Sequence, residues 1–328
     1  MRYPYIITLI LSLFFAAFAG AAGLRVGMIG MDTGHAITFT TLFNDPTNKD
    51  HVSGLKVVAA YKVSSPDIES SRSRVDEHAA KLQKEFGVTL YDSIEEMLKH
   101  VDAVLMEDND ARRHVEQARK VLRTGKPLYI EKPMVLSTKD AVELFAFAKK
   151  YHAPLYSGSG ARFQPELQAV RNGKIGKVLS LATGGSVNLE PTNPELFWYG
   201  VHGVESLFVI YGPGIETVTR KSSAKGAIVS EGKWKDGRIG TFYEGSRTLG
   251  KAVGEKGVST TVSRWDGYGP FVAAVATFLK TGISPVPEQE TIETMAFMEA
   301  DVISKARGGQ PVNVPEILKK AGYKAPKK

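Results

Sequence analysis

Two short segments carry side chains that could move protons. The first is Glu131-Lys132-Pro133, which follows the apolar run 127–130. The second comes about 70 residues later, where His202 has Gly200 two residues before it and Glu205 three residues after it. Burial at the end of a strand lowers the pKa of a lysine, so that its amine can act as an acid or base near neutral pH. A lysine of this kind, together with a histidine, would suit proton transfer to and from a sugar hydroxyl.

Strands and helices must position these residues, and the first half of the chain alternates between them. Apolar strands are expected at 24–30, 55–61, 102–106, 128–130 and 154–157, with helical segments between them. This alternation predicts a Rossmann-like, doubly wound parallel sheet. The carboxyl edge of that sheet should bring Lys132 and His202 into one cleft.

The second half of the chain has a different pattern. From about residue 179 the segments alternate or are rich in β-forming residues, and Asp236-Gly237 is a hairpin signal. Helices are expected at 270–280 and 288–305. The fold class is therefore α/β, with the Rossmann-like sheet followed by an α+β domain whose sheet is largely antiparallel. The expected domains are 23–156 for the dinucleotide and 157–328 for substrate and oligomerisation, with a homo-oligomer forming through the second sheet.

The composition fits two globular domains and gives no sign of a nucleic-acid partner. The 328 residues are 43% hydrophobic and 23% charged, with a formal net charge of +7. A nucleic-acid surface needs a basic stripe with interleaved aromatic residues, and the basic residues are instead dispersed apart from a lysine-rich tail. The partner expected from this sequence is a small carbohydrate.

Residues 1–22 have the pattern of a secretory signal peptide. Arg2 is their only charge, residues 6–15 are almost wholly apolar, and small residues follow. A retained membrane anchor is the alternative, although no basic cluster follows the apolar stretch. The chain has no cysteine, which excludes a lipid-modified cysteine and disulfides. We expect a periplasmic or secreted protein that meets the membrane only through a transient signal peptide.

The turn after the first strand is a weakened dinucleotide-binding turn. Rossmann folds place the pyrophosphate there, where glycines let the backbone approach and a helix N-terminus supplies N–H donors. In this chain Gly30, Thr33 and Gly34 belong to the turn, but Asp32 and His35 replace the second and third glycines of G-x-G-x-x-G. Gly34 could supply the missing space while Asp32 turns away to cap the helix. Alternatively, the nucleotide could bind weakly or in a shifted pose, or its site could be lost.

The second strand ends without the acid that NAD enzymes use for the ribose hydroxyls. Lys62 follows the strand, and together with Ser64 and Ser65 it could hold a 2′-phosphate or form a solvated loop. The expected cofactor is therefore NAD or NADP. The acidic run 107–110 lies beyond the third core strand. Together with Asp32 and His35 it could hold a divalent metal, but no spacing motif supports such a site and no metal is predicted.

The order of these motifs behind an N-terminal βαβ unit resembles the Gfo/Idh/MocA family of sugar-type oxidoreductases. The resemblance covers nearly all of the chain after the first 22 residues. It implies that Lys132, in the E-K-P motif, lies beside the nicotinamide and polarises the reacting hydroxyl, while Glu131 holds its surroundings. The family's D-x-G-x-H-x-x-D motif maps its proton acceptor to His202, with Glu205 in place of the last acid and Trp198 in place of the first.

Further site residues follow from the same resemblance. Asn109 belongs to an edge that lines the nicotinamide end, and Arg162 is a candidate donor to substrate or a scaffold salt bridge. Trp198 and Tyr199 could form a sugar-stacking platform. Other segments, including Met31 to His35, look like an exported subgroup of the family.

The resemblance implies an NAD(P)-dependent oxidoreductase that acts on a CH–OH group of a sugar or polyol. One alternative is a redox-neutral enzyme. It would oxidise a sugar, carry out an elimination or hydrolysis on the oxidised sugar, and then reduce the product with the retained cofactor. Another is a non-catalytic carbohydrate-binding protein that has lost the nucleotide.

Overall fold

The N-terminal half of the chain forms a six-stranded parallel sheet. The computed structural model describes residues 23–223, 225–247 and 250–325, so the expected signal peptide lies outside it. The strands are β1 (Leu24–Ile29), β2 (Leu55–Tyr61), β3 (Thr89–Tyr91), β4 (Ala103–Met106), β5 (Leu128–Ile130) and β6 (Leu155–Ser157). Their order is β3-β2-β1-β4-β5-β6, which confirms the doubly wound prediction. The strand order reverses between β1 and β4, where such folds bind dinucleotides.

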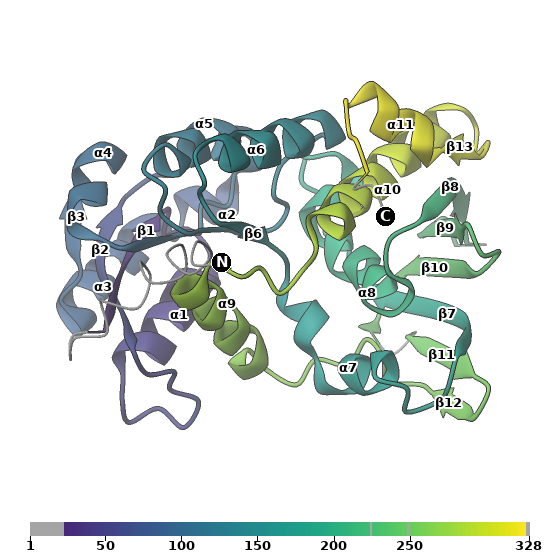
Figure 1. The fold of residues 1–328 in the computed structure, drawn as a ribbon, viewed down its shortest axis with the longest axis horizontal. Helices are drawn as coiled ribbons and strands as arrows, with labels where there is room; N and C mark the ends of the chain where they lie inside the picture. Colours follow the sequence, from purple (N-terminus) through teal and green to yellow (C-terminus); the bar gives the residue numbers. More distant parts are fainter. Residues whose placement is uncertain (1–22, 224, 248–249, 326–328) are drawn as a thin grey trace, which may run out of the picture.

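Helices cover both faces of this sheet (Figure 1). They are α1 (Gly34–Asn44), α2 (Glu69–Arg72), α3 (Val75–Phe86), α4 (Ile94–Met97) with the short turn η1 (Leu98–His100), α5 (Ala111–Leu122) and α6 (Thr138–Lys150). The helix α9 (Gly269–Thr281) returns from the second half of the chain and lies beside α1 (Figure 1). Its Phe271 and Val275 belong to the same buried cluster as Phe39 of α1. The N-terminal core is therefore completed by a helix that comes more than a hundred residues later.

The second half of the chain forms a mixed sheet. Its strands are β7 (Val178–Gly185), β8 (Ile215–Ser222), β9 (Ile228–Trp234), β10 (Ile239–Glu244), β11 (Lys251–Gly254), β12 (Gly257–Ser259) and β13 (Val312–Asn313). Their order is β12-β11-β7-β10-β9-β8-β13, and only the β7–β10 pair is parallel. The predicted hairpin at Asp236-Gly237 joins β9 to β10, and Gly237 has the positive φ of 83° that the turn requires.

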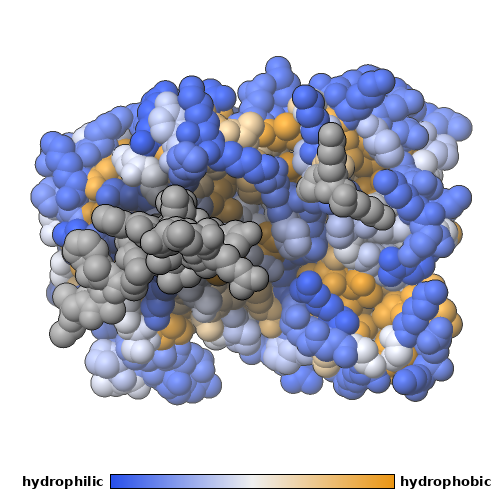
Figure 2. Space-filling model, in the orientation of Figure 1, coloured by the Kyte–Doolittle hydropathy of each residue, from blue (hydrophilic) through white to orange (hydrophobic). Residues whose placement is uncertain are grey.

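Helices pack on one face of the second sheet, and its other face carries exposed apolar side chains. The helices of this half are α7 (Pro165–Arg171), α8 (Val201–Tyr211), α10 (Glu288–Ala306) and α11 (Val314–Lys320), with the short turns η2 (Gly160–Phe163) and η3 (Leu196–Gly200). Phe242 of β10 is fully buried, whereas its neighbour Tyr243 and Ile239 point to the opposite face and are 38% and 45% exposed. Figure 2 shows a mostly hydrophilic surface with hydrophobic residues gathered at the lower right, over the second half of the chain. None of the helices described here is long and apolar enough to span a membrane.

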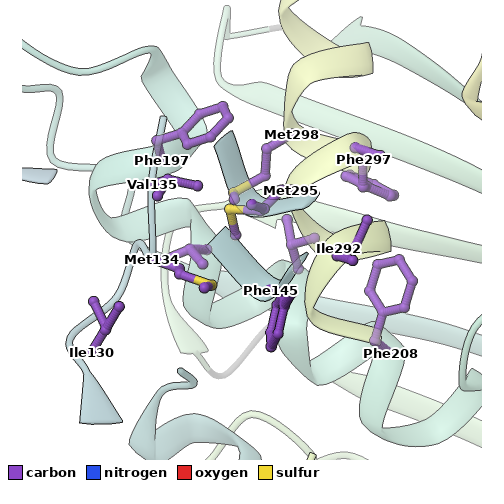
Figure 3. Packing of buried hydrophobic residues seen from close by; sticks show 14 of the residues in the cluster. Ile130, Met134, Val135, Phe145, Phe197, Phe208, Ile292, Met295, Phe297 and Met298 are labelled. Atoms are coloured by element: carbon purple, nitrogen blue, oxygen red, sulfur yellow. The ribbon is translucent and has the colours of Figure 1, made fainter. Parts of the chain in front are cut away.

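One buried cluster joins the two sheets and fixes the residues of interest. Met134, just beyond Lys132, packs in the same cluster as Phe197 from η3 and Met295 from α10 (Figure 3). Burying an apolar side chain of this size contributes about 1.5–3 kcal/mol. The turn that carries Lys132 and the segment that leads to His202 are therefore held by shared packing.

Candidate active site

Lys132 follows β5 and is held by three contacts. Its Nζ donates a hydrogen bond to the carbonyl of Trp198 at 3.3 Å and lies 3.7 Å from Oε1 of Glu131. The same ammonium stands over the ring of Tyr199, 4.6 Å from the centroid. The Lys132–Pro133 peptide bond is cis, and the lysine side chain is only 10% exposed. These contacts aim a positive charge from the parallel sheet at the segment before α8.

His202 lies in the first turn of α8, against the same tyrosine. Its ring makes an edge contact with Tyr199, with the centroids 5.7 Å apart. Its Nδ1 is buried and has no hydrogen-bond partner among the described residues. Burial lowers the pKa of His202 well below its ordinary value, and the positive charges of Lys132 and Arg247 act in the same direction. The imidazole is therefore neutral near pH 7, with one nitrogen free to accept a proton.

A small pocket of about 30 Å³ opens beside His202. Its lining includes Tyr199, Ser186, Ser263 and Arg247, and Arg247 is the one lining residue with a full charge among those the structure describes. Sequence reasoning missed Arg247 because it follows β10 in a loop that carries no recognisable motif. The guanidinium stacks over Trp265, 5.1 Å from the ring centroid. Hydroxyls, an arginine and a neutral histidine suit a polar ligand that bears several oxygen atoms.

Two expected substrate residues belong to the scaffold instead. Arg162 and Glu205 are 3% and 5% exposed, and their charged groups lie 3.7 Å apart. Arg162 also pairs with Glu290 of α10, and Glu205 accepts a hydrogen bond from the amide of Ser159 at 2.8 Å. A buried arginine needs such partners, because an unpaired charge is costly away from water. Of the two roles expected for Arg162, the structure favours the scaffold salt bridge, in which Glu205 is one of its partners.

The expected aromatic platform is divided between two environments. Trp198 is 8% exposed, so its ring belongs to the core and its carbonyl serves Lys132. Tyr199 is 37% exposed and lines the pocket. Of the two rings, only that of Tyr199 is placed to stack on a ligand.

The turn after β1 keeps one feature of a phosphate-binding turn. Gly30 has a φ of 79°, and a Cβ there would lie 2.4 Å from the amide nitrogen of Asp108, so only glycine fits. Thr33 is the N-cap residue of α1, and Gly34 is exposed, with open space within 4 Å of where a Cβ would lie. The first amides of a helix have no intrahelical acceptor and attract anions. The start of α1 therefore has the space and the donors for a phosphate.

Asp32 does not cap α1, contrary to one expectation from the sequence. Its carboxylate is fully buried and accepts hydrogen bonds from the amide of Asn109 at 3.0 Å and from the hydroxyl of Ser71. Burial and the charge of Asp108 raise the pKa of Asp32 to about 6, against these hydrogen bonds. Asp32 thus links the turn after β1 to the loop after β4 and to α2.

The segment after β2 lies across the same edge of the sheet. Ser65 donates a hydrogen bond to Asp110, and the side-chain amide of Asn109 donates one to Ser70 at 3.0 Å. Lys62 faces outward and pairs with the exposed Asp76 at 2.9 Å. Neither Lys62 nor Asn109 is free for a nucleotide in this conformation. The donors at the start of α1 fit the pyrophosphate of NAD, whereas the residues expected on the adenosine side already bond to other side chains of the protein.

A second group of ionisable side chains lies next to Lys132. His35 donates from Nδ1 to Glu131 at 2.8 Å, and the same nitrogen lies 3.9 Å from Glu107. Both carboxylates are buried. Burial, and then the charge of Glu131, raise the pKa of Glu107 well above its ordinary value. Burial also acts to raise the pKa of Glu131, but His35 and Lys132 outweigh it and the pKa is lowered.

Comparison with known proteins agrees with this geometry. Residues 24–159 match the model of an oxidoreductase family with an NAD-binding Rossmann fold. A comparison with curated proteins gave no match.

Three solved structures share the fold over both halves of the chain. A probable dehydrogenase from Thermotoga maritima is 19% identical with a TM-score of 0.70, over 90% of this chain and 100% of that one. The apo scyllo-inositol dehydrogenase from Lactobacillus casei is 13% identical with a TM-score of 0.70, over 90% and 99%. An oxidoreductase from Agrobacterium radiobacter, in complex with NAD⁺, L-tartaric acid and magnesium, is 15% identical with a TM-score of 0.68, over 90% and 100%. At these identities the likeness establishes the shared fold.

Proposed function

The N-terminal domain of this chain belongs to the Gfo/Idh/MocA oxidoreductase family, and from that premise we propose that the protein transfers a hydride between NAD(P) and a CH–OH group of a sugar or polyol. The observation that carries the proposal is the meeting of Lys132 and His202 at the ring of Tyr199, beside a polar pocket. These residues come from opposite halves of the chain and both suit proton transfer.

His202 and Lys132 have different roles at the substrate hydroxyl. When the alcohol is oxidised, a bound NAD(P)⁺ would supply the acceptor for the hydride from the carbinol carbon. The neutral His202, whose ring lines the pocket, takes the hydroxyl proton. The Lys132 ammonium stabilises the negative charge that develops on the oxygen, because the charge lies in a site with little water. In the reverse direction His202 returns the proton.

The remaining residues bind and orient. Tyr199 offers a partly exposed ring for the face of a sugar, and Arg247 offers a charged fork to hydroxyl or carboxylate oxygens. The first amides of α1 would hold the pyrophosphate. The signal-like residues 1–22 lead us to propose export to the periplasm or beyond, and the exposed Ile239 and Tyr243 lead us to propose a homo-oligomer through the second sheet.

A second candidate is a carbohydrate-binding protein without nucleotide. The bridge from Asp32 to Ser71 and Asn109 favours it, because it keeps a buried carboxylate in the turn where a dinucleotide fold has a glycine. Calorimetry with NAD and NADP, on the wild type and on Asp32→Gly, separates the two candidates. The oxidoreductase requires binding of at least one nucleotide, and tighter binding in the variant that lacks the carboxylate. No binding to either protein would leave the binding-protein candidate.

Turnover is tested with a panel of polyols, sugars and sugar acids in the presence of NAD(P)⁺. Formation of NAD(P)H with loss of the alcohol supports the proposal. A changed sugar without net NAD(P)H would instead indicate the redox-neutral reaction with retained cofactor.

A further inference from the structure

Three side chains from separate elements converge next to Lys132. His35 comes from the first turn of α1, Glu107 from the end of β4 and Glu131 from the end of β5. One possible ligand atom from each lies within 4.8 Å of the other two. Two of these separations are 2.8 Å and 3.9 Å, both measured from Nδ1 of His35.

Glu107 is the residue in this group that protein contacts do not satisfy. Its side chain is completely buried, and its Oε1 has no hydrogen-bond partner among the described residues. The other oxygen accepts one long hydrogen bond, 3.5 Å from the hydroxyl of Thr33, and lies 3.9 Å from Nδ1 of His35. A buried carboxylate normally has hydrogen bonds or a counter-charge, because the unpaired ion is costly to remove from water. The nearby Glu131 adds a second negative charge to the same place.

We propose that His35, Glu107 and Glu131 form a binding site for one divalent transition-metal ion. One imidazole nitrogen and two carboxylate oxygens are a donor set that Zn²⁺, Mn²⁺, Fe²⁺ and Co²⁺ accept. Ligand atoms around one such ion lie roughly 3–3.5 Å apart, since each metal–ligand distance is about 2.0–2.2 Å. The two measured separations, 2.8 Å and 3.9 Å, lie on either side of this range, so binding an ion requires small shifts of the side chains.

The surroundings of the three residues suit a bound ion. The hydroxyl of Tyr129 donates to Glu131 at 3.2 Å, so this ligand is oriented by a second contact, as metal ligands usually are. A bound ion would place positive charge beside the two buried acids and would favour the ionised form of Glu107. His35 is 14% exposed, which leaves an approach from solvent.

This site does not depend on NAD, and its test is made without nucleotide. The wild-type protein is treated with a chelator, dialysed, and titrated separately with Zn²⁺, Mn²⁺ and Co²⁺. Calorimetry and elemental analysis measure the stoichiometry, and the visible absorption of Co²⁺ reports the ligand geometry. We expect one ion per chain for at least one of these metals, and an increase in the melting temperature on binding.

Three variants assign the ligands. Glu107→Gln and His35→Gln should each weaken binding at least tenfold, since each removes one of three ligands. His100→Gln is the matched control, because His100 lies beside Glu96 on the surface and should leave binding unchanged. Glu107→Gln keeps the shape of the side chain and cannot ionise, so its metal-free form should melt no lower than the metal-free wild type. Absence of a bound ion in the wild type, or wild-type affinity in both Glu107→Gln and His35→Gln, would overturn the proposal.

Discussion

Replacing Asp32 with asparagine should stabilise the protein, and only where the carboxylate is ionised. The pKa of Asp32 is raised from 3.8 to about 6, chiefly by burial. A raised pKa means that the stability contributed by this group is complete below pH 3.8 and is lost as the pH rises through about 6. A pKa raised this far corresponds to a cost of about 3 kcal/mol for the ionised form in the folded state.

The asparagine of the Asp32→Asn variant can keep one hydrogen bond of the aspartate and replace the other with a bond in the opposite direction. Its side-chain oxygen can accept from the amide of Asn109, and its NH₂ can donate to the hydroxyl of Ser71. The variant should therefore unfold at a higher urea concentration at about pH 8, with a gain of up to about 3 kcal/mol in the free energy of unfolding. The gain should be about half as large near pH 5 and should vanish below about pH 4. An equal gain at all pH values, or a loss at about pH 8, would refute the idea that ionised Asp32 is held at a cost.

Three further predictions concern the pocket and its scaffold. Arg162→Met should lower the free energy of unfolding by about 3–5 kcal/mol in urea denaturation, because Glu205 and Glu290 lose their buried partner. Unchanged stability together with lost substrate binding would instead assign Arg162 to the substrate site. Arg247→Gln should raise KM by roughly 10–100-fold with a smaller effect on kcat, as expected for one charged hydrogen bond to substrate, and an unchanged KM would remove Arg247 from the site. In an NMR titration the ring of His202 should stay neutral as the pH falls through 6.5, since its pKa is lowered well below that value, and a midpoint at 6.5 would contradict the burial argument.

The fold could be predicted from the sequence because local patterns determine it. The alternation of apolar strands with helices indicates a parallel sheet, and Asp236-Gly237 can hardly be anything but a turn between β-strands. The position of Lys132 could also be expected, because the carboxyl ends of parallel strands share one edge of the sheet, whereas the expectation that His202 meets it came from the family resemblance.

Partners that are distant in sequence could not be predicted. Nothing near Arg162 reveals that Glu290, on a helix from the far end of the chain, neutralises it. Asp32 looks like a helix cap in the sequence, and its role as a bridge depends on Ser71, which folds back from α2. Likewise, the sequence indicated that the run 107–110 lies near Asp32 and His35 but predicted no metal, whereas the structure brings Glu107 and His35 to Glu131 from the next strand. In each case the sequence showed the side chain but not its environment.

The most direct test of the proposed chemistry is a double-mutant cycle on Lys132 and His202. It compares single-turnover rates of hydride transfer in the wild type, Lys132→Ala, His202→Ala and the double variant, with NAD(P) and substrate saturating. Each single substitution should slow the step roughly 10²–10⁴-fold, because positioned acid–base groups contribute about that much. The double variant should lose less than the product of the two single effects, since both residues serve one proton transfer. Rates within a few-fold of wild type in either single variant, at unchanged stability, would contradict the assignment of the two residues to that step.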